Sequence, residues 1–189
     1  MADGFDNKFL TRTIIDVVED TFDKLLHVTP ASGAVANEKN IIEFGGRMRL
    51  FPMEKFNGPA YVSIVNFYRT SKDMADHFAA GTFVLFVKED AAEKLVKAFG
   101  RSSKEAEDET AVMGICAELC GILSGNLKNA MVKHGYPELV VGEPLKYKNS
   151  IPEGAQFDYD LFKKQEIIFS YWKDKSVIVE ACIGNIPRR

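Results

Sequence analysis

The stretch DETAVMGICAELCGILSGNLKNAMVKH, residues 108–134, has the hydrophobic pattern of a long amphipathic helix. At about 100° per residue its apolar side chains form one broad stripe, which we expect to pack on a β-sheet. Gly135, Tyr136 and Pro137 follow the stretch and predict the end of the helix. The stripe consists of Val112, Ile115, Cys116, Leu119, Ile122, Leu123, Leu127 and Ala130.

Three glycines and one carboxylate share the neighbouring face of this helix. Gly114, Glu118, Gly121 and Gly125 fall within an arc of about 60° on the helical wheel. Each glycine inside a helix costs about 1 kcal/mol relative to alanine, so the pattern needs a compensating role. Two interpretations stay open: close packing against a second helix of the same chain, with Glu118 solvated, or the approach of another molecule.

The rest of the chain predicts an α+β fold, with a sheet of about six strands and two long helices packed on one face. Residues 29–33 are expected to end the first helix, residues 101–107 to form a polar linker, and residues 149–164 to be an excursion of undefined structure. The expected helices are 8–27, 89–99 and 108–134, and residues 71–80 are expected to form either a short helix or a long connection. The expected strands are 41–50, 60–68, 82–88, 139–145, 166–171 and 177–183.

The composition is that of an ordinary soluble protein. Its 189 residues, 46% hydrophobic and 27% charged, predict one domain over residues 1–189. The net charge of −3 argues against a nucleic-acid partner. We see neither a basic, apolar leader nor a span of about 18 uncharged residues, so we expect a cytoplasmic protein without a membrane partner.

The cysteines allow two interpretations. Cys116 and Cys120 stand four residues apart on the predicted helix, as two zinc ligands can, but a structural zinc site needs four ligands. The third, Cys182, is distant in sequence, and an odd number of cysteines does not suggest a disulfide framework. We expect buried cysteines that behave as small hydrophobic residues, and no bound metal.

The segment 118–126, ELCGILSGN, followed by Gly135-Tyr136 and by VGEP at 141–144, resembles the CheC/CheX/FliY family of chemotaxis phosphatases, and most closely its CheX-like branch. The family pattern is Asp or Ser, three residues, Glu, two residues, Asn, twenty-two residues, Pro. Glu118 and Pro144 stand at the Glu and Pro positions. Gly114 and Gly121 depart from the pattern, because they stand where the family has Asp or Ser and Asn.

The resemblance implies a partner and a reaction. The partner would be a phosphorylated CheY-like response regulator that carries its own Mg²⁺, so this chain would need no cofactor. Glu118 would meet a partner lysine, and the group at the Asn position would hold the water that attacks the aspartyl phosphate. Gly114, Gly125 and Pro144 would shape the docking surface, and the single motif implies a homodimer. The apolar hairpin of residues 166–183 would offer an edge for that dimer.

Gly121 has no side chain to hold a water, so three functions stay open. They are a CheX-like phosphatase with altered activity, a response-regulator-binding module without catalysis, and a small-molecule-binding domain with this helix as a pocket wall. Asn126 and Asn129 lie about 12 and 16 Å from Glu118 along the helix axis, too far to replace the motif Asn. A side chain from residues 149–164 is the remaining candidate for that role.

Overall fold

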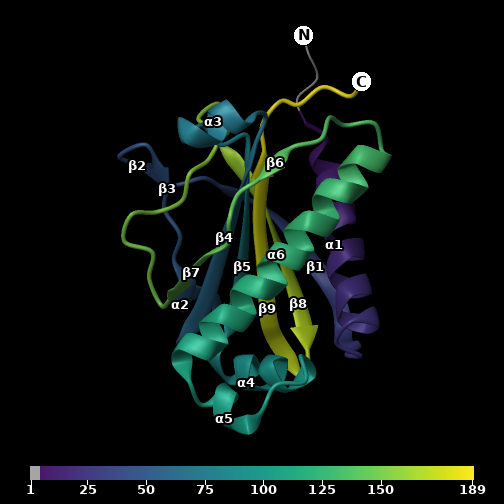
Figure 1. Ribbon diagram of the computed structural model, residues 1–189, viewed down its shortest axis with the longest axis vertical. Helices are drawn as coiled ribbons and strands as arrows, with labels where there is room; N and C mark the ends of the chain where they lie inside the picture. Colours follow the sequence, from purple (N-terminus) through teal and green to yellow (C-terminus); the bar gives the residue numbers. More distant parts are fainter. Residues whose placement is uncertain (1–4) are drawn as a thin grey trace.

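The computed structural model describes residues 5–189 and shows a twisted antiparallel sheet with helices across one face (Figure 1). The helices are α1 (Asn7–Lys24), α2 (Pro52–Phe56), α3 (Ser71–Ala75), α4 (Glu89–Ala98), α5 (Ser103–Ala106) and α6 (Glu109–Lys133). The strands are β1 (Pro30–Asn40), β2 (Glu43–Phe44), β3 (Arg47–Met48), β4 (Ala60–Tyr68), β5 (Gly81–Lys88), β6 (Val140–Val141), β7 (Leu145–Lys148), β8 (Lys163–Tyr171) and β9 (Asp174–Ile183).

The main sheet has seven strands in the order β1-β8-β9-β5-β4-β6, and β7 also pairs with β4. Every pairing in it is antiparallel. Strands β2 and β3 form a separate two-stranded sheet. The α+β class is therefore confirmed, and the sheet has one strand more than the six we expected.

Both faces of the central strands are buried, and successive residues alternate between two cores. On β5, Phe83, Leu85 and Val87 lie in the core under α1, α4 and α6. Val84 and Phe86 lie in the second core, which is closed by α2, β3 and residues 149–162. The undefined excursion thus has a structural role, because it covers the sheet face opposite α6.

Helices α1 and α6 lie side by side on the first core (Figure 1). Asp6 caps α1 and Asp108 caps α6 through hydrogen bonds from backbone N–H groups of the first turn. The ring of Phe22 on α1 stacks on Tyr171 of β8, with centroids 3.9 Å apart. The apolar stripe of α6 is confirmed, except that Ile122 and Ala130 are only partly buried beside α1.

The expectation for residues 29–33 is wrong in part, because Pro30 begins the eleven-residue strand β1. Helix α1 does end before this segment, at Lys24. Strand β1 lies at the edge of the sheet and is almost entirely exposed, so it lacks the alternation of apolar and polar residues that predicts a strand. Its partner β8 places it, through backbone hydrogen bonds that the sequence does not reveal.

Three smaller expectations are corrected as well. Residues 41–50 form the short β2–β3 pair, because Gly45 and Gly46 turn the chain with positive φ angles. The expected strand 139–145 is divided into β6 and the start of β7, with Pro144, which lacks an N–H donor, between them. The expected linker 101–107 contains α5, whose start has a capping box between Ser102 and Glu105.

The hairpin of β8 and β9 is confirmed, but it is not an edge of the sheet. Strand β9 pairs with β5 on its other side, and β8 pairs with β1. The physical argument for a dimer through this hairpin is therefore wrong, since its backbone donors and acceptors are already paired. The free edge on this side of the sheet belongs to β1.

One helix among residues 5–189, α6, is long and apolar enough to cross a membrane by length and composition. Its packing accounts for that composition, because nine of its residues are buried against the sheet and the neighbouring helices.

Candidate functional site

The face of α6 that carries Glu118 points away from the sheet. Leu119 and Cys120 are buried beneath it, while the side chain of Glu118 is about half exposed. Lys148 of β7 links the first residues of α4 and α6, because its ammonium group lies 2.7 Å from a carboxylate oxygen of Glu89 and 2.8 Å from one of Glu109. These hydrogen bonds raise the pKa of Lys148, so its positive charge persists at neutral pH.

The glycines of this face are not used for packing within the chain. A Cβ atom added to Gly114 or to Gly125 would meet no atom within 4 Å outside its own stretch of helix. The interpretation in which the glycines admit a second helix of the same chain is therefore wrong for these two positions. No packing contact among residues 5–189 therefore offsets the cost of these two glycines in helix stability.

Gly121 has one neighbour, the ring of Pro144. A Cβ atom at position 121 would stand 3.3 Å from Cγ of Pro144, a contact that a small shift of the ring relieves. The structure thus brings together two positions that are twenty-three residues apart in the sequence. Leu145, the next residue, exposes 47% of its surface and adds an apolar group that we did not predict as part of the site.

Arg101 is a second addition to the site. Its Nη2 atom lies 3.7 Å from Oε2 of Glu118, and both side chains are about half exposed. An exposed pair of this kind contributes under about 1 kcal/mol, so Glu118 stays available to a stronger cation from outside. Arg101 directly follows Gly100, which has a φ of 75° just after the end of α4. A glycine that ends a helix is visible in the sequence, and it is the signal that could have indicated where Arg101 lies.

No carboxamide group of residues 5–189 replaces the missing motif Asn in the contacts that the structure shows. Asn126 turns toward α1, where its Nδ2 atom donates to Oγ1 of Thr21 at 3.4 Å. Residues 149–162 pack on the opposite face of the sheet, so they do not reach α6. The carboxamide of Gln156 in that segment is used elsewhere, because its Oε1 atom accepts from the hydroxyl group of Tyr68 at 3.0 Å. The candidate role of the excursion in the site is therefore wrong.

The cysteines are part of the cores. Cys116, Cys120 and Cys182 are free and buried, and no group of three potential metal ligands exists among the residues that the structure describes. Burial raises the pKa of Cys120 to about 12, and Sγ of Cys120 donates to the Ser63 oxygen at 3.6 Å. These thiols are therefore neutral and unreactive at neutral pH.

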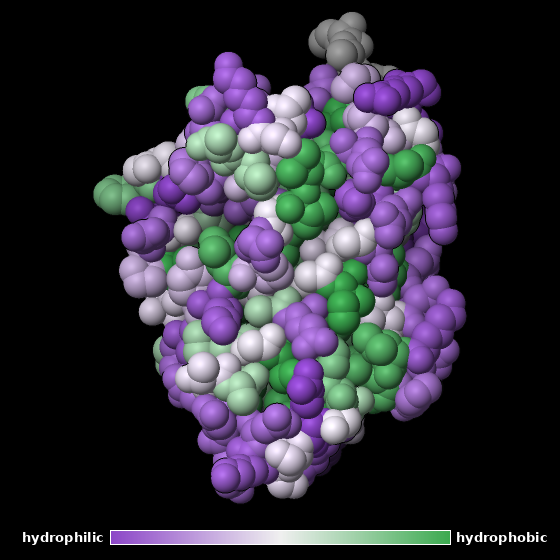
Figure 2. Space-filling view, viewed as in Figure 1, coloured by the Kyte–Doolittle hydropathy of each residue, from purple (hydrophilic) through white to green (hydrophobic). Residues whose placement is uncertain are grey.

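A groove of about 680 Å³ runs between α1 and α6, beside the face that carries Glu118. Ile122, Asn126 and Val17 are among the residues that line it, and Glu118 is not. Figure 2 shows pale, weakly polar surface along α6 and greener, apolar surface between α6 and α1. A small-molecule pocket walled by α6 would therefore use this groove rather than the glycine face.

No protein-family model and no curated protein matches the sequence. Solved structures do match the fold. A CheC-like protein from Shewanella sp. PV-4 has a TM-score of 0.62 at 14% identity, covering 93% of this chain and 97% of that one. CheX from Borrelia burgdorferi, solved as a CheX–CheY–BeF3–Mg²⁺ complex, has a TM-score of 0.57 at 13% identity, covering 92% and 97%.

Thermotoga maritima FliY matches with a TM-score of 0.53 at 12% identity, covering 93% of this chain and 86% of that one. The chain therefore has the fold of the CheC, CheX and FliY proteins, and the resemblance read from the sequence is confirmed at the level of the fold.

We predict that Gly114→Ala and Gly125→Ala each raise the free energy of unfolding by about 1 kcal/mol, because alanine favours the helix and the added methyl group meets open space. Chemical denaturation measures the change. Gly121→Ala serves as the comparison and should gain less, since its methyl group meets Pro144. A loss of stability in Gly114→Ala or Gly125→Ala would mean that the face packs within the chain.

Proposed function

We propose that the glycine face of α6, with Glu118 at its centre and Pro144 beside it, docks a phosphorylated CheY-like response regulator. The observation that carries this proposal is the open space at Gly114 and Gly125, which the chain itself does not fill. The fold supports it, because one protein with this fold, the Borrelia CheX, was solved with CheY, BeF3 and Mg²⁺. The Mg²⁺ ion would be carried by the regulator.

Glu118 is the group that we propose to bind the partner. Its carboxylate is exposed and held only weakly by Arg101, so a lysine of the regulator can replace that contact. A charge-assisted hydrogen bond between carboxylate and ammonium groups is short and directional, which orients the docked partner. The glycines on either side would let the regulator's surface approach the backbone of α6, and Leu145 would add apolar contact.

Docking without efficient catalysis is the function that the geometry supports best. Hydrolysis of an aspartyl phosphate requires a positioned water and stabilised charge, and the family places the water with the Asn side chain. Position 121 offers only a backbone here, and Asn126 is turned toward α1. Phosphatase activity is the second candidate, favoured by the retained Glu118 and Pro144.

We predict that Glu118→Gln weakens binding to the phosphorylated regulator about tenfold, because a charge-assisted hydrogen bond contributes about 1.5–3 kcal/mol. Each CheY-like regulator of the source organism would be phosphorylated with a small acyl-phosphate donor and Mg²⁺, and its binding followed by calorimetry. Glu138→Gln is the control, an exposed acid beyond the end of α6. Equal affinity of all three proteins would contradict the proposed role of Glu118.

An amide side chain restored at position 121 would distinguish docking without catalysis from phosphatase activity. We predict that Gly121→Asn accelerates loss of the regulator's phosphoryl group about tenfold or more, because the amide would position the attacking water. The Asn Cβ atom requires a shift of a few tenths of an ångström from Pro144. Gly121→Ala, which adds the same Cβ atom beside Pro144 but no amide, is the control and should leave the rate unchanged. A wild-type rate that already matches Gly121→Asn would favour the phosphatase.

We also propose a homodimer, and we place its contact at β1 rather than at the β8–β9 hairpin. Strand β1 is an edge strand of eleven residues, so a second copy can extend the sheet. The irregular pairing of residues 30–35 with β8 leaves residues 35–40 as the regular part of this edge. Sedimentation at micromolar concentration should show a dimer, and Val35→Pro should shift it toward monomer; a wild-type monomer would contradict the proposal.

A further inference from the structure

The backbone of Arg101 is fixed between two short helices, α4 and α5. The N–H group of Gly100 donates to the Lys97 oxygen at 2.9 Å. That of Arg101 donates to the Val96 oxygen at 3.2 Å, which completes a Schellman motif at the end of α4. The next residue, Ser102, begins α5 with a capping box. Hydrogen bonds on both sides therefore fix the point from which the Arg101 side chain extends toward α6.

The guanidinium group of Arg101, in contrast, is held only weakly. Within the described part of the chain its one ion pair is with Glu118, at 3.7 Å between Nη2 and Oε2. That separation is too long for a hydrogen bond. The planar group therefore keeps its N–H donors for an acceptor from outside the chain.

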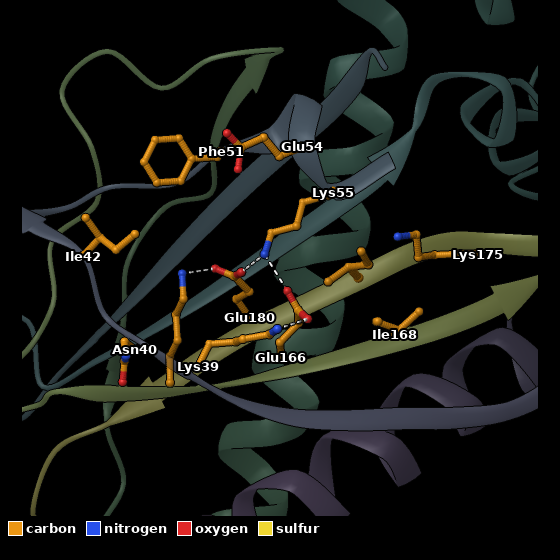
Figure 3. A pocket seen from close by; sticks show the side chains of 12 residues that line it. Lys39, Asn40, Ile42, Phe51, Glu54, Lys55, Glu166, Ile168, Lys175 and Glu180 are labelled. Atoms are coloured by element: carbon orange, nitrogen blue, oxygen red, sulfur yellow. Dashed lines mark hydrogen bonds and ion pairs between the residues drawn. The ribbon is translucent and has the colours of Figure 1, made fainter. Parts of the chain in front are cut away.

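Lysines on the sheet face opposite α6 show how this chain binds a cation that it uses for its own packing. Lys55 lies between Glu166 and Glu180 (Figure 3), with Nζ 2.5 Å from Oε2 of Glu166 and also hydrogen-bonded to Oε1 of Glu180. Lys164 binds the other oxygen of Glu180 at 2.5 Å. Arg101 has no such set of close partners, so packing within residues 5–189 does not account for its charge beside Glu118.

The proposed docking of a phosphorylated regulator brings an anion close to this guanidinium group. The phosphoryl group would lie near position 121, where the family pattern has the Asn that holds the attacking water. Glu118 stands one helical turn before Gly121, and side chains at this spacing start about 5–6 Å apart. A Cβ atom at position 121 would meet only Pro144 within 4 Å, so the surface there is open to a long side chain as well as to the partner.

A change of partners follows when a lysine of the regulator binds Glu118. The weak contact between Arg101 and Glu118 is replaced, and the guanidinium group is released beside the phosphoryl group. Guanidinium is planar, always charged, and matches two phosphate oxygens with two parallel N–H donors. An unmodified regulator offers no such acceptor, so the new hydrogen bonds form only with the phosphorylated partner.

We propose that Arg101 is the residue by which this site distinguishes a phosphorylated regulator from the unmodified one, through hydrogen bonds to the phosphoryl oxygens. The inference rests on the proposed docking at Glu118 and assigns to a second residue the recognition of the phosphoryl group. It involves no catalytic step, because Arg101 binds the anion and positions no water. The fixed backbone of Arg101 limits what the side chain must lose in order to bind.

The test compares two forms of one CheY-like regulator of the source organism. BeF3 with Mg²⁺ would serve as a stable substitute for the phosphoryl group, and calorimetry would give the affinity for the loaded and for the unmodified regulator. We expect the wild type to prefer the loaded form and Arg101→Gln to lose about tenfold of that preference, because charge-assisted hydrogen bonds are lost. Its affinity for the unmodified regulator should not fall, since Arg101 has no acceptor there.

Three further variants complete the comparison. Arg69→Gln is the matched control, because its side chain is 46% exposed against 47% for Arg101 and also pairs with one carboxylate, that of Asp158. It should keep the wild-type preference. Arg101→Lys keeps the charge without the planar pair of donors and should retain part of the preference. Glu118→Gln should weaken the binding of both forms, because the lysine contact does not require the phosphoryl group.

The outcomes separate this inference from the docking proposal on which it rests. An unchanged preference in Arg101→Gln would overturn the inference, and so would an equal loss of affinity for both forms, which is the result of a purely structural role. Either result leaves docking at Glu118 standing. A wild-type protein that binds neither form of any regulator would overturn the docking proposal and this inference with it.

Discussion

The packing of α6 on β4 and β5 is the constraint on which the rest of the structure depends. Its stripe of Leu119, Leu123 and Leu127 is fully buried in the same core as Val65 and Leu85. Burying each such side chain contributes about 1.5–3 kcal/mol, which fixes the rotation of the helix about its axis. Once this stripe faces the sheet, Glu118 and the glycines must face outward. The candidate site is therefore a direct consequence of core packing.

That outward face has few contacts of its own. Gly114 and Gly125 border open space, and the ion pair of Glu118 with Arg101 is exposed and weak. Pro144 and Leu145 reach the face only because β4 pairs with β7 beside the helix. A surface that lowers helix stability, holds its carboxylate only weakly and is fixed by the core beneath it supports the docking role that we propose.

The opposite face of the sheet differs from the face under α6, because only part of it is apolar. Where α2 and residues 149–162 cover β4 and β5, the buried surface of the sheet is an apolar core. Toward β8 and β9 this surface changes to charged residues, with Lys55 between Glu166 and Glu180. A buried ion pair is seldom more stabilising than apolar residues of the same volume, so this cluster is not evidence of added stability.

The sequence by itself determined the elements whose side chains alternate or repeat with a strong period: α1, α6, and the interior strands β4, β5, β8 and β9. It also determined which face of α6 carries Glu118, because helical geometry fixes that from spacing alone. Only the tertiary structure decided the place of β1, whose exposed residues carry no pattern. It also decided the contact of Gly121 with Pro144, the position of Arg101 and the covering of the second face by residues 149–162. These depend on which strands pair and which surfaces meet, and a local hydrophobic pattern does not encode contacts between residues so distant in the chain.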